Sequence, residues 1–361
     1  MVVIPVYDEP FLLRTLMNLQ KCDLPKCAVE VLIIVNNGVH VSEKILEVNR
    51  ATYLQAMAWS KANFKPMLKF HVLFQDELPK FFASRNVALK IGMDEAVFRL
   101  EKAKSKRGII ATLDADFRVE KNYFVELEKH FRRRKVPRIC QTEFAFPLTG
   151  IDFDDKVYAA AMQYELHLRY LEKAYVFAGF QPNLEGLPTS FAMGTDVYQK
   201  RGGWSSALGN SNLLHDVFVL DKTVVSPSPR VTNCETKGSG ATIKSIIKNK
   251  GIALTYHPDC FVDLKAFFAK NGKLNAIVLE DLKDDSQCIF EYFKSIDFED
   301  CQLNEESFLA YFEKTHLEKF LVFAHGEFYD RIDALEALKL FFSDVGELSG
   351  RDWLLYLRKM D

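Results

Sequence analysis

Short apolar runs alternate with longer helical stretches through the first half of the chain. The apolar runs occupy residues 2–6, 29–35, 69–74 and 108–113. Residues 11–20 carry apolar side chains at helical spacing, and further helical stretches lie at about 43–62, 80–105 and 120–134. Strands and helices that alternate in this way are typical of parallel βαβ units. We therefore predict an α/β fold with a mostly parallel, twisted sheet and helices on both faces.

The pattern loosens after about residue 150. Residues 154–179 are predicted to form one long helix, and 187–204 combine small residues, a strand-like centre and a Gly-Gly turn. The segment 211–231 is expected to contain a strand that leads into a Ser/Pro loop. Because 361 residues exceed one typical domain, we expect a large domain followed by a smaller, acid-rich helical region at 265–361.

Composition and charge narrow the class of protein. Hydrophobic residues make up 48% of the chain and aromatic residues 13%, which is enough for a large packed core. The net charge of -2, from 47 basic and 49 acidic residues, argues against a nucleic-acid-binding protein. The seven cysteines contain no CxxC pair, so we expect free thiols rather than a structural zinc site. No signal-peptide pattern and no apolar run of about 18 residues is present, which predicts a cytoplasmic protein without a membrane span.

Polar residues gather at the expected carboxyl ends of the four strands. Ligands of parallel α/β sheets bind outside these ends. The clusters are Tyr7-Asp8, Asn36-Asn37, Gln75-Asp76 and Asp114-Asp116. Their agreement across four separate strands predicts a ligand site at this edge of the sheet.

Asp114-Ala115-Asp116 follows the fourth apolar run directly. In a strand, residues two apart point to the same face, so the two carboxylates are expected to converge at the strand end. Carboxylates so close repel each other unless a cation lies between them, and Mg²⁺ and Mn²⁺ prefer oxygen ligands. A turn with solvated acids is the alternative interpretation. A DxDx[TV] phosphatase motif fits poorly, because Arg118 stands in place of Thr or Val.

Five segments, in order, resemble glycosyltransferase family 2, whose members have the Rossmann-like GT-A fold. The segments are VVIPVYDEPFLLRTLMNL, VLIIVNNG, FFASRNVALKIGMDEA, ATLDADFRVEKNYF, and RGGW with a later HD. The resemblance covers about residues 1–230. It implies a GT-A catalytic domain at 1–264, with a nucleotide-sugar half at about 1–118 and an acceptor half at about 119–264. Residues 265–361 then form a C-terminal, mainly helical region.

The resemblance assigns several residues to a nucleotide-sugar donor. Asp114 and Asp116 are similar to the DxD pair of the family, which holds Mn²⁺ or Mg²⁺ on the donor diphosphate. Arg85 lies in a segment similar to the ARN motif, whose Arg helps to hold the donor; a surface Arg at a helix start is the alternative. Asn36 stands where many members carry the first Asp of VDDGS, a departure that affects the base preference, and a plain Asn-Asn-Gly turn is equally compatible.

The first strand and the loop that follows it resemble the donor-binding stretch of the family. Pro5, Val6 and Tyr7 would line the nucleotide base, and Asp8 or Glu9 would face the ribose and base.

Transfer to an alcohol also needs a base that takes the acceptor's proton. In the family this base is the Asp of an ED or HD pair after a Gly-Gly-aromatic turn, and here Gly202-Gly203-Trp204 precedes His215-Asp216. Asp216 is therefore the implied catalytic base, although a carboxylate at a helix start also complements the helix dipole.

His257 is a further candidate metal ligand, because some GT-A enzymes use a late histidine. A lone histidine more often fills a hydrogen-bonding position.

Together these residues imply a metal-dependent glycosyltransferase that moves a sugar from a nucleotide-sugar to a carbohydrate or other acceptor hydroxyl, by direct displacement with inversion. A sugar nucleotidyltransferase is the enzymatic alternative, but those enzymes open with a Gly-rich loop and a basic residue where this chain has PVYDEP. A catalytically silent nucleotide-sugar-binding scaffold is the other alternative. The DxD pair, Arg85 and Asp216 together argue against it.

Overall fold

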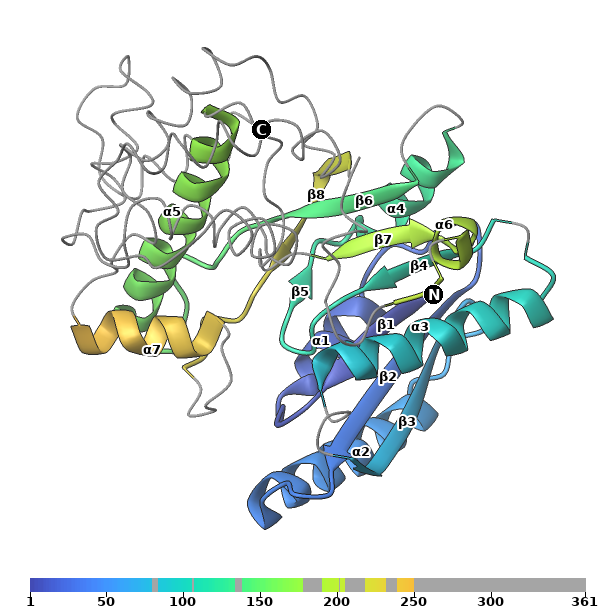
Figure 1. Ribbon diagram of the computed structural model, residues 1–361, viewed down its shortest axis with the longest axis horizontal. Helices are drawn as coiled ribbons and strands as arrows, with labels where there is room; N and C mark the ends of the chain where they lie inside the picture. Colours follow the sequence, from blue (N-terminus) through green and yellow to red (C-terminus); the bar gives the residue numbers. More distant parts are fainter. Residues whose placement is uncertain are drawn as a thin grey trace, which may run out of the picture. The chain divides into compact units, whose positions relative to one another are not determined.

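The computed structural model of the chain divides into two compact units (Figure 1). It describes residues 1–79, 84–105, 107–133, 138–177, 190–200, 202–204, 218–231 and 239–249. The first unit comprises Met1–Pro147 and Glu185–Ser228, and the second comprises Leu148–Leu184 and Pro229–Asp361. The predicted boundary at 264 and the predicted C-terminal helical region, 265–361, lie outside the described residues.

An eight-stranded sheet forms the centre of the first unit, in the order β3-β2-β1-β4-β7-β6-β8-β5. The first half of the sheet is parallel and consists of β1 (Val2–Val6), β2 (Val29–Gly38), β3 (Leu68–Leu78) and β4 (Ile109–Thr112). The second half consists of β5 (Arg118–Val119), β6 (Ile139–Phe144), β7 (Phe191–Gly194) and β8 (Phe218–Ser226). β7 is antiparallel to β4 and β6, and β5 is antiparallel to β8, while β6 and β8 are parallel. The sheet is therefore mixed but mostly parallel, as predicted.

Helices lie on both faces of the parallel half, which confirms the prediction. The helices of this unit are α1 (Leu12–Gln20), α2 (Glu43–Ala62), α3 (Arg85–Lys102), α4 (Tyr123–Arg132) and α6 (Thr195–Lys200). Met93 of α3 lies in one buried cluster with Leu32 of β2. Trp59 of α2 packs edge-on against Phe70 of β3, and Phe70 pairs in register with Val31. Because neighbouring strand residues 31 and 32 point to opposite faces, α2 and α3 cover opposite sides of the sheet.

A glycine sets how closely α3 approaches the sheet. A Cβ atom at Gly92 would overlap Val3 Cγ1 and lie 3.0 Å from Ile34 Cγ1. Only a residue without a side chain fits at this contact, so the helix rests directly on β1 and β2. The start of α3, which carries Arg85, is thereby held against the same strands.

The second unit contains α5 (Asp155–Phe177), which packs against α7 (Ser239–Asn249). Charged side chains are buried on α5: Arg169 Nη2 lies 3.6 Å from Glu165 Oε1, and both residues are almost inaccessible to solvent. Burial also lowers the pKa of the neighbouring His167 to about 4. No helix within the described part of the chain is long and apolar enough to cross a membrane.

Candidate functional site

The order of the parallel strands reverses beside β1. The chain runs from β1 outward through β2 to β3 and then returns to β4, on the other side of β1. At such a reversal the connecting helices leave on opposite faces, and a crevice opens between the two strands. Tyr7 and Asp8 follow β1, and Asp114 follows β4, so these predicted site residues flank the reversal point.

Buried amides hold the loop after β1 in an unusual conformation. Asp8 has a φ of 51°, in the left-handed region that few residues with side chains adopt. Its backbone N–H donates to Asn49 Oδ1 over 2.8 Å, and Asn49 Nδ2 donates in turn to Asn37 Oδ1 over 2.6 Å. Asn37 and Asn49 are both fully buried. The end of β2 and the helix α2 therefore fix the backbone of Asp8.

The predicted base-binding stretch is only partly accessible. Pro5 and Val6 are buried strand residues, whereas 40% of Tyr7 is exposed. Glu9 is buried, and its Oε1 accepts a hydrogen bond of 2.8 Å from the backbone N–H of Phe11 at the start of α1. Side-chain contacts with a ligand at this edge therefore fall to Tyr7 and Asp8, while Glu9 is used to begin the helix.

Asn36 supports the start of α3 from beneath. Only 1% of this residue is exposed, and its Nδ2 donates to the backbone carbonyl of Ser84 over 3.4 Å. Ser84 is the N-cap of α3, since its Oγ accepts a hydrogen bond from the backbone N–H of Val87. Asn36 thus contacts the residue directly before Arg85 rather than the solvent at the sheet edge.

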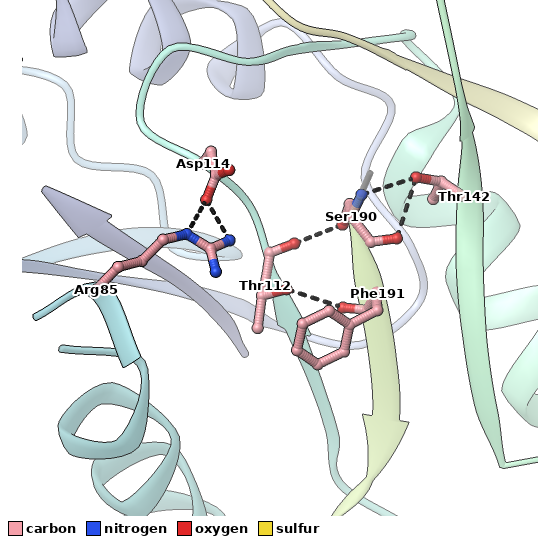
Figure 2. Close-up of polar contacts among 6 residues, drawn as sticks. All are labelled: Arg85, Thr112, Asp114, Thr142, Ser190 and Phe191. Atoms are coloured by element: carbon pink, nitrogen blue, oxygen red, sulfur yellow. Dashed lines mark hydrogen bonds and ion pairs between the residues drawn. The ribbon is translucent and has the colours of Figure 1, made fainter. Parts of the chain in front are cut away.

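Arg85 and Asp114 form an ion pair across this edge (Figure 2). Arg85 Nε and Nη2 donate to the same Asp114 oxygen, Oδ1, over 2.9 and 2.6 Å. The side chains are 51% and 30% exposed, so both remain open to a ligand. Two residues that the sequence placed at a ligand site, one from the start of α3 and one from the loop after β4, are brought together.

The two aspartates do not continue a strand, and the expectation that strand pleating aligns them is wrong. β4 ends at Thr112, and Asp114 to Phe117 form a turn in which the Phe117 N–H donates to the Asp114 carbonyl over 3.1 Å. At and beyond the end of β4, side-chain hydroxyls bond the backbone carbonyls: Ser190 Oγ donates to Thr112 O, and Thr15 Oγ1 donates to Ala115 O.

The Ser190 contacts belong to a buried hydroxyl cluster that links β4 to β6 (Figure 2). Ser190 Oγ donates to the Thr112 carbonyl over 2.5 Å, and Tyr123 Oη lies 2.7 Å from the same Oγ. Thr142 Oγ1 donates to the Ser190 carbonyl over 3.1 Å and accepts from the Ser190 N–H over 3.2 Å. No local pattern in the sequence indicates this cluster, because its hydrogen-bonded partners are 48 to 78 residues apart.

Two polar residues of α1, and one residue just after its end, contact the segment that contains the aspartates. We call Thr15, Asn18 and Cys22 the α1 polar stripe. Thr15 bonds Ala115, Asn18 bonds both backbone groups of Val119, and Cys22 Sγ lies 3.6 Å from the Glu120 carbonyl. A usable sequence signal exists for Thr15, because it lies at helical spacing among Leu12, Leu16 and Leu19, on the buried face of the helix.

The donor set of the turn fits a hard divalent cation that keeps part of its water shell. Asp114 and Asp116 supply two half-exposed carboxylates, and Mg²⁺ is commonly held by one or two carboxylates together with phosphate oxygens of its ligand. Within the described residues no group of three His, Cys, Asp or Glu side chains converges.

The Gly-Gly turn that precedes the predicted base in the sequence is well defined. Gly202 and Gly203 have φ values of 75° and 88°, which confirms the Gly-Gly turn. Trp204 is buried and stacks on Phe191 of β7, with 5.1 Å between the ring centroids. His215 and Asp216, the implied base, lie outside the described residues, as does His257.

No protein-family model matches the sequence, and no curated protein matches it either. Solved structures of S. aureus TarS align with the chain. The fragment 1–349 aligns at 15% identity and a TM-score of 0.33, over 82% of this chain and 79% of that one. The same fragment with UDP-GlcNAc aligns at 14% identity and a TM-score of 0.33, over 82% and 80% of the two chains. The complex with UDP aligns at 12% identity and a TM-score of 0.34, over 80% and 77%.

The sheet itself confirms the predicted α/β class, and its mixed, mostly parallel order is consistent with a GT-A-like fold.

Proposed function

We propose that this protein is a metal-dependent glycosyltransferase of the family 2 type. It moves a sugar from a nucleotide-sugar donor to a hydroxyl group of a carbohydrate or other acceptor. The ion pair of Arg85 and Asp114, beside the reversal point of a parallel sheet, is the observation that carries the proposal. An arginine that can form two parallel hydrogen bonds suits a diphosphate, and the carboxylates beside it suit the cation that accompanies a diphosphate.

The accessible residues divide into a nucleotide part and a diphosphate part. Tyr7 offers an exposed ring on which a base can stack, and the Asp8 carboxylate can accept hydrogen bonds from ribose hydroxyls. Arg85 binds the diphosphate oxygens. Asp114 and Asp116 hold Mn²⁺ or Mg²⁺, which would neutralise the charge that develops on the departing diphosphate.

The acceptor is activated by Asp216. Its carboxylate takes the proton of the acceptor hydroxyl while that oxygen bonds to the anomeric carbon and the bond from this carbon to the diphosphate breaks. An in-line displacement of this kind inverts the anomeric configuration. His257 is the candidate for an additional metal ligand. These two assignments rest on the sequence resemblance.

A thermal-shift panel tests the proposal. UDP and UDP-GlcNAc, the ligands present in the two TarS complexes, are the first probes, followed by GDP- and dTDP-sugars, each with and without Mn²⁺. A ligand present at about 100 times its Kd stabilises the folded state by about 2.7 kcal/mol, and the shift should grow with Mn²⁺. Stabilisation by nucleoside triphosphates with sugar phosphates would favour a nucleotidyltransferase. Binding without release of nucleoside diphosphate would favour a silent scaffold, and no shift with any probe would refute the donor assignment.

The Asp116→Ala variant tests the proposed metal site directly. It should abolish transfer and most of the Mn²⁺-dependent stabilisation while leaving the fold intact, because Asp116 lies in a turn outside the core. Asp23→Ala is the matched control, since Asp23 is an exposed carboxylate paired with Lys121 at 3.2 Å. Full activity in Asp116→Ala would remove the aspartate pair from the proposed metal site.

A further inference from the structure

We propose that Thr15 is a positioning residue, which sets the relative direction of the Asp114 and Asp116 carboxylates through the backbone of Ala115. The inference rests on the proposed role of these carboxylates in binding the metal and the diphosphate. It adds a residue of α1 that lies 100 positions away in sequence.

The contact is short and buried. Thr15 Oγ1 donates to the Ala115 carbonyl over 2.7 Å, and only 1% of Thr15 is exposed. Water therefore cannot replace the hydroxyl at this carbonyl without opening the helix. A hydrogen bond in such a low-dielectric environment is stronger than one at the surface, and its loss leaves a buried acceptor unpaired.

Two hydrogen bonds fix two successive peptide planes of the turn. The Asp114 carbonyl, in the plane between residues 114 and 115, accepts from the Phe117 N–H over 3.1 Å. The Ala115 carbonyl, in the plane between residues 115 and 116, accepts from Thr15. Because each plane is rigid, their orientations determine how the Cα–Cβ bond of Asp116 points relative to that of Asp114. Without the Thr15 hydroxyl, the peptide plane between residues 115 and 116 loses the hydrogen bond that α1 makes to it.

The other residues of the α1 polar stripe hold the backbone that follows the aspartates. Asn18 Oδ1 accepts from the Val119 N–H over 2.7 Å, and Asn18 Nδ2 donates to the Val119 carbonyl over 3.1 Å. Thr15 and Asn18 are three residues apart, so they lie on one face of α1. Cys22 follows the end of the helix, and its Sγ lies 3.6 Å from the Glu120 carbonyl. Of these three residues, only Thr15 bonds the residue that lies between the two aspartates, Ala115.

A purely structural threonine would behave differently. A helical Thr usually bonds the carbonyl four residues earlier in its own helix. The Thr15 hydroxyl instead bonds a carbonyl in a distant turn, and it does so from a face otherwise formed by Leu12, Leu16 and Leu19. Burying a hydroxyl among leucines is unfavourable unless a specific partner compensates, and that partner is the peptide between the two aspartates.

The test compares Thr15→Val, Thr15→Ser and Thr195→Val in the full-length protein. Valine keeps the shape of threonine and removes the hydroxyl, whereas serine keeps the hydroxyl. Thr195→Val is the matched control, since Thr195 Oγ1 donates to the Gly108 carbonyl over 3.5 Å, next to the other end of β4. Electron paramagnetic resonance measures Mn²⁺ affinity, first with Mn²⁺ alone and then with Mn²⁺ and the nucleoside diphosphate that stabilises the wild type. Melting temperatures are recorded alongside.

We expect Thr15→Val to weaken Mn²⁺ binding by about 10- to 100-fold, the loss typical when a group that orients a metal ligand is removed. Thr15→Ser should restore the wild-type affinity, and Thr195→Val should retain it at a similar melting temperature. If Thr15→Val does not fold, Thr15→Ala carries the same expectation, and the serine variant must still bind Mn²⁺.

Wild-type Mn²⁺ affinity in Thr15→Val, or an equal loss in Thr195→Val, would overturn the positioning role and leave the proposed function standing. Loss of affinity in Thr15→Ser would overturn it as well. A wild-type protein that binds no Mn²⁺ with UDP, GDP or dTDP would instead refute the metal site and both inferences with it.

Discussion

At the scale of single residues, Arg85 bonds one oxygen of Asp114, a carboxylate that is also proposed to hold a divalent cation. Both Arg85 nitrogens bond one carboxylate oxygen, so the cation and the guanidinium would compete for it. A donor diphosphate relieves this competition, because its oxygens accept the same forked pair of N–H groups. We therefore expect donor and metal to bind more tightly together than either does alone.

Arg85→Ala should weaken donor binding by about 10- to 100-fold, since hydrogen bonds to charged groups contribute about 1.5–3 kcal/mol. Mn²⁺ alone should bind the variant at least as tightly as the wild type, and Arg85→Lys should restore donor binding only in part. Calorimetric titrations measure both affinities. Arg132→Ala, at an exposed position on α4, is the control. If Arg85→Ala binds the donor as tightly as the wild type, Arg85 is a surface residue at the helix start and does not bind the donor.

The position of the site was predictable from single residues, but the direction of most side chains was not. Arg85, Asp114 and Asp8 follow strands whose order places them at one edge, and hydrophobic patterning is sufficient to predict that. Glu9 and Asn36 turn inward because the Phe11 N–H and the Ser84 carbonyl lie there. Such partners are created by loop paths, which have no periodicity in the sequence. The donor roles themselves stay predictions.

At the scale of elements, α3 illustrates a helix whose position depends on an absent side chain. Gly→Ala in a helix interior ordinarily stabilises a protein by about 1 kcal/mol. Gly92→Ala should do the opposite, by about 1–3 kcal/mol, because its Cβ meets the stiff, buried Val3. Urea denaturation measures the change, and Lys102→Ala, in the last turn of the same helix, is the control. A stabilised Gly92→Ala protein would show that the helix can retreat from the sheet.

The helix α5 should make stability depend on pH. Burial lowers the pKa of His167 from its ordinary value of 6.5 to about 4, so the folded state keeps the imidazole neutral while the unfolded state protonates it near 6.5. The contribution is therefore complete above pH 6.5 and is lost as the pH falls toward 4, up to a limit of about 3 kcal/mol. His167→Gln should make the free energy of unfolding depend less on pH between pH 4 and 6.5, as measured by urea titrations. An unchanged slope would show that other groups cause the acid sensitivity.

The succession of strands and helices was predictable, whereas their ends were not. Apolar runs and helical spacing correctly indicated β1 to β4 and the helices between them. β2 and β3 continue to Gly38 and Leu78 because they pair with each other beyond the apolar runs, for example at Asn36 and Gln75. β4 ends at Thr112, where Ser190 Oγ rather than a neighbouring strand bonds the carbonyl. Ends of strands depend on partners distant in sequence, which a local pattern cannot contain.

At the scale of the whole molecule, each compact unit is built from two separate stretches of sequence. The first unit, which contains the sheet, consists of Met1–Pro147 and Glu185–Ser228. The helix α5 belongs to the second unit, together with residues 229–361. Periodicity predicted α5 as a helix but contains no information on which unit a helix joins. The contiguous catalytic domain expected at 1–264 remains a prediction, because its boundary lies outside the described residues.

A protein truncated after residue 264 should be poorly soluble or inactive. Residues 265–361 carry Phe and Leu at helical spacing, among them Phe308, Phe312 and Leu321, and such a stripe is more often core than a binding face. If it packs on the rest of the protein, its removal leaves an apolar patch that favours aggregation. Soluble yield and turnover of the truncated and full-length proteins provide the comparison. A soluble fragment with full activity would show that residues 265–361 form an independent module.

The amide chain from Asp8 to Asn37 also bears on how the protein ages chemically. Asn37 precedes Gly38, and an Asn-Gly peptide is prone to deamidation, in which the glycine nitrogen attacks the asparagine side-chain carbonyl. In the folded protein both residues lie in β2, Asn37 is fully buried, and its side-chain oxygen accepts a hydrogen bond from Asn49. The ring closure that deamidation requires is therefore blocked. The time that a molecule spends unfolded, rather than its age, should decide whether Asn37 becomes an aspartate.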